Sequence, residues 1–138
     1  MGDQKTAVIT WKGESLQFSG ELGSGYQFDV SGQANLENGG SPMEFLLAGV
    51  AGCTAVDVVS ILRKMRQPLT GLTVEIRGAR AAAHPKVYTA VEIVYILAGD
   101  LDPTAVEKAI ALSEETYCSA SAMFKQAGTT VTTSYRLT

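Results

Sequence analysis

The segment 45–62 constrains the fold more than any other part of the chain, because almost all of its side chains are apolar. Its only ionisable residues are Cys53 and Asp57. A helix that is apolar nearly all round is normally a buried one. The uninterrupted apolar run before Asp57 falls short of the roughly 20 residues that a membrane span requires. The sequence therefore predicts a long core helix that needs cover on several sides.

Both ends of this helix carry termination signals. Ser41 is a suitable N-cap, Pro42 fits the first helical position, and Glu44 completes a capping box. The helix is predicted to run to about Arg66, just before Pro68. The capping box accounts fully for Glu44, which we interpret as structural rather than as an acid or base.

The remaining segments predict strands and two shorter helices. Residues 6–31 alternate with period two and contain glycine-rich turns, which indicates an antiparallel meander, and 31–40 reads as a polar linker. Further strands are expected at 72–77, 87–97 and 129–137, and a helix that opens at Asp102-Pro103 is expected to bury one stripe. The stripe comprises Val106, Ala109, Ile110 and Tyr117. This order predicts an α+β fold in a single domain, residues 1–138.

Composition excludes several functions. The net charge is −3 and the pI about 5.1, which argues against nucleic acid as a partner. The N-terminal segment has no apolar signal core, so we expect a cytoplasmic protein with no membrane partner and with reduced thiols.

Two cysteines, Cys53 and Cys118, stand 65 positions apart, and no C-x-x-C motif is present. His84 is the only histidine, so the best metal set is two thiols and one imidazole, fewer than the four ligands of a structural zinc site. We expect neither a metal nor a cofactor. A Ser-His-Asp triad is also not expected, since no G-x-S-x-G motif occurs.

Each cysteine has a functional and a structural interpretation. Cys53 is either a reactive thiol or a small apolar residue of a buried helix, and Asp57, one turn later, disfavours a thiolate there. The stripe that continues through Ser60 and Lys64 is best read as solvent-facing in its last turn. Cys118 either gains from the amides of a following helix, expected to run to Phe124, or fills a helix junction.

Arg80 and His84 are two further site candidates. Arg80 shares the register of the inward residues on its strand, so it either reaches into a site or marks where the strand leaves the core. His84 precedes Pro85 in a predicted turn and is interpreted as an exposed loop residue.

Three stretches resemble the OsmC/Ohr family, and especially its OsmC-like branch of uncertain function. They are SPMEFLLAGVAGCTAVDVVSIL at 41–62, HPKVYT at 84–89 and LDPTAVEKAIALSEETYCSASAM at 101–123. The resemblance implies an OsmC-like fold, with antiparallel sheets around a long central helix in an intertwined homodimer. It also implies that Cys53 reduces a hydroperoxide and becomes a sulfenic acid, that Cys118 resolves it as a disulfide, and that an external dithiol restores both thiols.

The sequence departs from active members of that family at two places. No arginine precedes Arg63, and Met43 rather than an acidic residue follows Pro42. Arg80 is the candidate to replace the missing arginine. The leading hypothesis is a thiol-dependent peroxidase, acting on organic hydroperoxides or hydrogen peroxide in oxidative-stress defence. The alternative is a non-enzymatic OsmC-like protein that binds a small hydrophobic ligand at the dimer interface.

Overall fold

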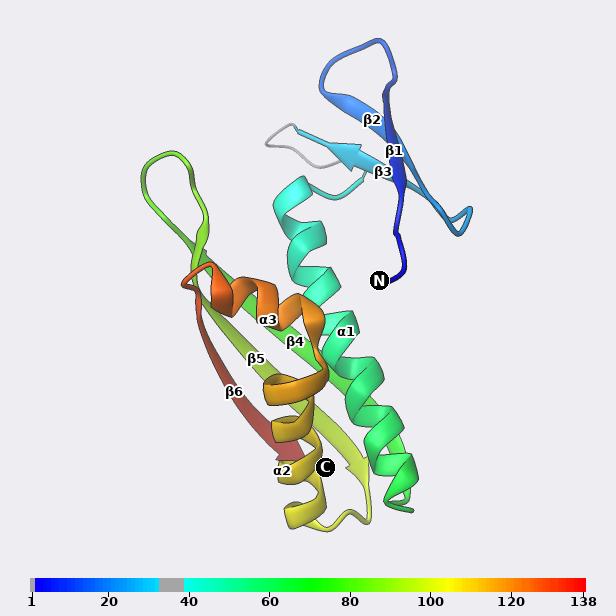
Figure 1. Cartoon of the computed structure of the whole chain (residues 1–138), viewed down its shortest axis with the longest axis vertical. Helices are drawn as coiled ribbons and strands as arrows, with labels where there is room; N and C mark the ends of the chain where they lie inside the picture. The colour runs from blue at the N-terminus through cyan, green and yellow to red at the C-terminus, as the bar shows by residue number, and fades with distance from the viewer. Residues whose placement is uncertain (1, 33–38) are drawn as a thin grey trace. The chain divides into compact units, whose positions relative to one another are not determined.

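The computed structural model describes residues 2–32 and 39–138, so most of the predicted linker at 31–40 lies outside the described residues. The α+β class is confirmed, with two three-stranded sheets and three α-helices (Figure 1). The chain divides into two compact units, Met1–Leu46 and Leu47–Thr138, which are described separately.

The first unit contains the predicted antiparallel meander. Strands β1 (Ala7–Trp11), β2 (Gln17–Leu22) and β3 (Gln27–Ser31) form a sheet in that order. Strand β1 is exposed along its whole length, although its alternation predicted a half-buried strand. One face of the unit holds an apolar groove of about 610 Å³. Its lining residues are Ile9, Phe18, Leu22, Tyr26, Phe28, Val30, Pro42 and Phe45.

The capping box at the start of α1 (Pro42–Lys64) is confirmed. The backbone amide of Ser41 donates to Oε1 of Glu44 at 2.9 Å, and the amide of Glu44 donates to the Ser41 hydroxyl at 3.4 Å. The Ser41 amide and the Ser41 hydroxyl, which also donates to Oε1 at 2.9 Å, hold the pKa of Glu44 below its ordinary value. The carboxylate is therefore occupied in satisfying helix amides that have no partner within the helix.

Replacing Glu44 with glutamine is expected to leave thiol reactivity toward peroxide within a few-fold of wild type, because an amide oxygen still accepts from Ser41.

The same variant tests the pH dependence of stability. The contribution of the wild-type carboxylate to stability should be lost as pH falls through its lowered pKa, and the glutamine variant should not show this loss. Thermal melts between pH 3 and 7 provide the measurement. A hundredfold loss of peroxide reactivity at unchanged melting temperature would contradict a purely structural Glu44.

The second unit is built on a mixed sheet in the order β4-β5-β6 (Leu69–Arg80, Tyr88–Gly99 and Thr130–Leu137). Strands β4 and β5 are antiparallel, but β6 pairs parallel to β5, so the sheet is not wholly antiparallel as expected. The reason is that the chain crosses between β5 and β6 through helices, and such a crossover returns the strand in the same direction. Central strand β5 buries Val91, Ile93, Tyr95 and Leu97.

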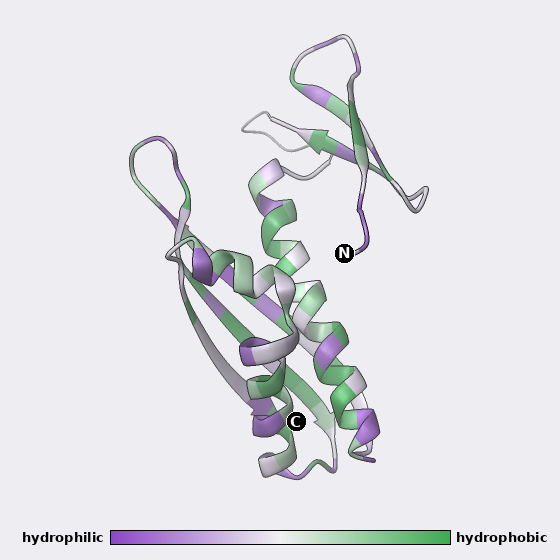
Figure 2. Ribbon diagram, viewed as in Figure 1, coloured by the Kyte–Doolittle hydropathy of each residue, from purple (hydrophilic) through white to green (hydrophobic). Residues whose placement is uncertain are grey.

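Helix α1 is less buried within the protomer than its sequence predicts. Only one stripe of α1 is buried, which comprises Val50, Thr54, Val58 and Leu62. Apolar residues elsewhere on the helix remain exposed, as with Val56 at 69%. Figure 2 shows hydrophobic residues, in green, along much of α1. The expectation of burial on all sides is wrong for the single chain, because one sheet covers one face of a helix.

The apolar segment of α1 is longer than expected from the sequence. An 18-residue window has a mean hydropathy of 2.1, so by length and composition the helix is long enough to cross a membrane. The apolar segment of α1 therefore continues past Asp57. The Asp57 carboxylate accepts a hydrogen bond from the Ser113 hydroxyl within the fold. A core helix of a soluble fold explains this placement better than a membrane span.

The crossover consists of α2 (Pro103–Leu112), a π-helical turn η1 (Ser113–Tyr117) and α3 (Ser119–Gln126). The predicted start is confirmed, since Asp102 caps α2 through the amide of Thr104. Tyr117, however, is 58% exposed and does not share the buried stripe of α2. The π turn inserts an extra residue per turn, which rotates every later side chain away from the α-helical register.

Candidate functional site

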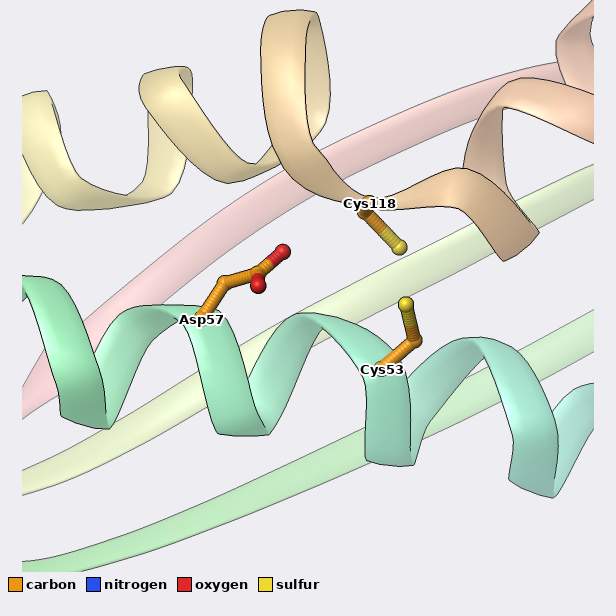
Figure 3. A group of neighbouring side chains, drawn as sticks. All are labelled: Cys53, Asp57 and Cys118. Atoms are coloured by element: carbon orange, nitrogen blue, oxygen red, sulfur yellow. The ribbon is translucent and has the colours of Figure 1, made fainter. Parts of the chain in front are cut away.

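The two cysteines of the chain meet in the second unit, together with Asp57 (Figure 3). The Sγ atoms of Cys53 and Cys118 and one carboxylate oxygen of Asp57 all lie within 4.8 Å of one another. Cys53 is partly exposed and Cys118 is 2% exposed, so one thiol is accessible and the other is not. The site therefore combines an accessible sulfur, a buried sulfur and a carboxylate.

Local structure explains why these three side chains converge. Cys53 and Asp57 are one turn apart on α1 and point to the same side (Figure 3). Cys118 lies at the junction of η1 and α3, where its amide donates to the Ser113 carbonyl five residues earlier, at 2.7 Å. This last bond of the π turn ends the helix in extended backbone and places Cys118 opposite α1.

Cys118 is the N-cap of α3, and its sulfur accepts the amide of Ser121 at 3.3 Å. One of the two alternatives left open by the sequence was that helix amides favour a thiolate here. Burial nevertheless raises the pKa of the Cys118 thiol to about 12, against the lowering effect of the Ser121 amide, and the nearby Cys53 and Glu114 raise it further. Cys118 is thus a neutral thiol in the reduced protein, because desolvation exceeds the amide's contribution. Of the two alternatives, the activated thiol is not the one that the structure favours.

This raised pKa predicts a loss of stability in alkali. Between pH 9.0 and about 12 the unfolded chain releases the Cys118 proton while the folded chain retains it, so the free energy of unfolding should decrease across that window. Urea unfolding at several pH values measures the slope. In Cys118→Ser, which keeps a capping oxygen, the slope should be shallower, and an identical slope would contradict the raised pKa.

A continuous chain of hydroxyl groups runs from Asp57 into the core. The Ser113 hydroxyl donates to Oδ2 of Asp57 at 2.9 Å, and its oxygen lies 2.8 Å from Oγ1 of Thr54. Thr54 Oγ1 in turn lies 2.7 Å from the hydroxyl of Tyr95, which donates to Oε1 of Glu114 at 3.2 Å. Burial raises the pKa of Tyr95 well above its ordinary value, so it acts as a neutral hydroxyl. Carboxylates therefore terminate both ends of this hydroxyl chain.

Glu114 connects the far end of the chain to Cys118 and to solvent. Its Oε2 accepts the Ser121 hydroxyl at 2.5 Å and the ammonium of Lys125 at 3.2 Å. Lys125 also donates to the Glu114 carbonyl at 2.8 Å. The Glu114 side chain is 8% exposed, whereas that of Lys125 is 38% exposed. Glu114 therefore fixes the residue whose amide contacts Cys118.

The sequence did not identify Ser113, Thr54, Tyr95 or Glu114 as part of the site. One signal was present: Thr54 and Tyr95 are polar groups inside otherwise apolar segments, and buried hydroxyls normally have a hydrogen-bond partner. The role of Ser113 depends on the π turn, which periodicity does not reveal.

Other sequence candidates lie apart from this cluster. The Arg80 side chain is exposed, and its Nε donates to the Lys86 carbonyl in the β4–β5 hairpin at 2.9 Å. His84 is exposed in the same hairpin, as expected. Ser60 and Lys64 are exposed too, which confirms a solvent-facing last turn of α1.

Among the described residues, the donor atoms of Cys53, Asp57 and Cys118 are the set of three that lie close together, but we do not assign them as metal ligands. Asp57, rather than His84, supplies the third donor, which corrects the metal set expected from sequence. Three donors are one fewer than a closed structural zinc site uses.

Comparisons with known proteins agree over nearly the whole chain. A family model described as OsmC-like protein matches residues 32–134. Protein YhfA of Escherichia coli (strain K12) is 38% identical over 132 residues, which cover 95% of this chain and 96% of that protein. A hypothetical protein from Aquifex aeolicus VF5 is 30% identical, with a TM-score of 0.84 and 99% of each chain covered. An organic hydroperoxide resistance protein OsmC from Legionella pneumophila shares the fold, at 17% identity, a TM-score of 0.73 and 96% coverage of both chains.

Proposed function

The chain belongs to the OsmC-like family, and we propose that it is a thiol-dependent peroxidase that reduces organic hydroperoxides or hydrogen peroxide through Cys53 and Cys118. The observation that carries this proposal is the approach of the two sulfurs to within 4.8 Å, with only Cys53 accessible. A pair of thiols at this separation needs little movement to form a disulfide.

The proposed cycle assigns a separate task to each cysteine. The Cys53 sulfur attacks the outer oxygen of the peroxide, the O–O bond breaks, and the thiol proton leaves with the departing alcohol or water. The Cys118 sulfur then attacks the sulfenic acid on Cys53, which releases water and forms the disulfide. An external dithiol reduces this disulfide and becomes oxidised in its place.

Burial supports this division of tasks. An accessible sulfur meets the oxidant first, whereas a buried neutral thiol such as Cys118 is protected from direct oxidation. The Legionella pneumophila relative is described as a predicted redox protein, which agrees with this chemistry. A cytoplasmic location and action as a homodimer remain part of the proposal. A role for Arg80 also remains part of it, although within the protomer its Nε is bound to the Lys86 carbonyl.

Titration of thiols before and after one equivalent of cumene hydroperoxide tests the proposed function. We expect both thiols of each chain to disappear and a Cys53–Cys118 peptide to appear in the tryptic digest. Dithiothreitol should restore both thiols. Unchanged thiol content after this treatment would exclude the peroxidase.

A second candidate is a non-enzymatic protein that binds a small hydrophobic ligand. The apolar groove of the first unit, about 610 Å³ in volume, favours it, because that is within the size range of ligand pockets. On this hypothesis the thiols survive the peroxide treatment, and a fluorescent apolar probe binds with one site per chain.

A further inference from the structure

The resolving step poses a problem that the two cysteines alone do not solve. Cys118 is a neutral thiol, because burial raises its pKa to about 12, and a thiol must lose its proton to act as a nucleophile. The hydroxide that leaves Cys53 must at the same time gain a proton to depart as water. A group that contacts both sulfurs and exchanges protons would satisfy both requirements.

We propose that Asp57 is the catalytic acid–base of disulfide formation between Cys53 and Cys118. This inference rests on the proposed function. As the Cys118 sulfur uses its electron pair to form the S–S bond, its proton passes to the Asp57 carboxylate. The S–O bond of the Cys53 sulfenic acid breaks, and Asp57 returns the proton to the departing hydroxide, so that one water is released.

Position is the first observation that supports this role. A carboxylate oxygen of Asp57 lies within 4.8 Å of both sulfurs, and the stick view shows the side chain directed toward the space between α1 and Cys118 (Figure 3). The Ser113 hydroxyl holds the carboxylate in place, at 2.9 Å from Oδ2. Glu114, the other acid beside Cys118, has both oxygens engaged by Tyr95, Ser121 and Lys125.

The hydrogen count of the hydroxyl chain is the second, independent observation. Four contacts link Asp57, Ser113, Thr54, Tyr95 and Glu114 in series, but the three hydroxyls supply only one hydrogen each. With both terminal carboxylates ionised, one contact in the chain therefore lacks a hydrogen.

A fourth hydrogen, placed on Asp57, completes the chain. Asp57 then donates to Ser113, Ser113 to Thr54, Thr54 to Tyr95, and Tyr95 to Glu114. Every contact in the series then has a hydrogen of its own, so each can be a normal hydrogen bond. The core behind Asp57 is thus arranged to hold one extra proton for the duration of the step.

The Asp57→Asn variant distinguishes a role of Asp57 in proton transfer from an effect of its negative charge alone. The amide keeps the shape and can still accept from Ser113, but it cannot take a proton. If Asp57 acts as the acid–base, resolution should slow by about a hundredfold, the lower end of general acid–base contributions. If Asp57 acts only through its charge, removing that charge favours the Cys118 thiolate and resolution should accelerate.

Two readouts measure the same step. After one equivalent of cumene hydroperoxide, dimedone should trap Cys53 as a sulfenic acid in Asp57→Asn while wild type forms the disulfide. With 5,5′-dithiobis(2-nitrobenzoate), Cys53 first forms a mixed disulfide, and Cys118 then displaces the second thionitrobenzoate. The slow second release in Asp57→Asn does not need peroxide, so it tests Asp57 even if the protein is not a peroxidase.

Controls keep the result interpretable. Glu107→Gln on α2 removes a carboxylate that holds the Tyr135 hydroxyl at 2.6 Å, away from the sulfurs, and should resolve at the wild-type rate. Asp57→Ala should also be slow, and added formate should restore part of its rate, which a structural defect would not permit. Wild-type or faster resolution in Asp57→Asn, or no rescue of Asp57→Ala by formate, would overturn the proposal.

Discussion

Replacing Cys53 with serine is expected to reduce peroxide consumption to the background rate, whereas replacing Cys118 with serine should preserve the first oxidation. The reason is that only Cys53 is accessible to an oxidant, while Cys118 is 2% exposed and held as a neutral thiol. In Cys118→Ser no second thiol captures the sulfenic acid. Cys53 should then accumulate in that state and proceed to sulfinic acid with excess peroxide.

Mass spectrometry of tryptic peptides distinguishes these states. Wild type should yield a linked Cys53–Cys118 peptide, Cys118→Ser a dimedone adduct on Cys53, and Cys53→Ser an unmodified Cys118 at the same peroxide dose. Oxidation of Cys118 in Cys53→Ser at the wild-type rate would reverse the assigned roles. Absence of the linked peptide, with Cys53 no more reactive than free cysteine, would favour the ligand-binding alternative.

The sequence predicted the elements of this fold well, because their signals are local. The capping box of Ser41 and Glu44, the Asp102 cap of α2 and the alternating strands depend on neighbouring residues, and the structure confirms them. The parallel pairing of β6 with β5 depends on the path of the whole crossover. The alternation of residues within β6 does not indicate whether the strand pairs parallel or antiparallel to β5.

The candidate site was predicted in part, for a related reason. The i to i+4 spacing on a helix places Cys53 beside Asp57, but the approach of Cys118 depends on the π turn, 60 residues later in the chain. The sequence left the state of Cys118 open, since its position at a helix start was visible and its burial was not. Arg80 fits the strand register, yet its Nε contacts the Lys86 carbonyl in the hairpin. The strand register determines on which face of the sheet a residue lies, but it does not determine where the end of a long side chain lies.

One property of α1 remains unexplained by the protomer. Beyond the buried stripe, its surface carries Gly49, Gly52 and Val56 at spacings of three and four residues, which is one helix face. A Cβ added at either glycine would meet no atom within 4 Å, so packing within the protomer does not require glycine at these positions. Glycine in a helix interior costs about 1 kcal/mol relative to alanine, which suggests that a partner approaches this face closely.

We therefore expect a dimer in solution with this face of α1 at the interface, and we expect Val56→Asp to dissociate it. Val56 is 69% exposed in the protomer and borders an apolar groove between α1 and Leu72 of β4. Burying such a surface gains roughly 25 cal/mol per Å² of apolar area, and a buried aspartate without a partner reverses that gain. The dissociation constant should increase by at least about a hundredfold, equivalent to about 2.7 kcal/mol.

Sedimentation velocity at low micromolar concentration measures this effect. Wild type should sediment at about twice the chain mass of 14.6 kDa, and Val56→Asp at the mass of one chain. Lys108→Asp, which places the same side chain on the exposed surface of α2, should remain dimeric. A folded wild-type monomer at these concentrations would contradict the dimer, and the exposed apolar face of α1 would then require a different partner.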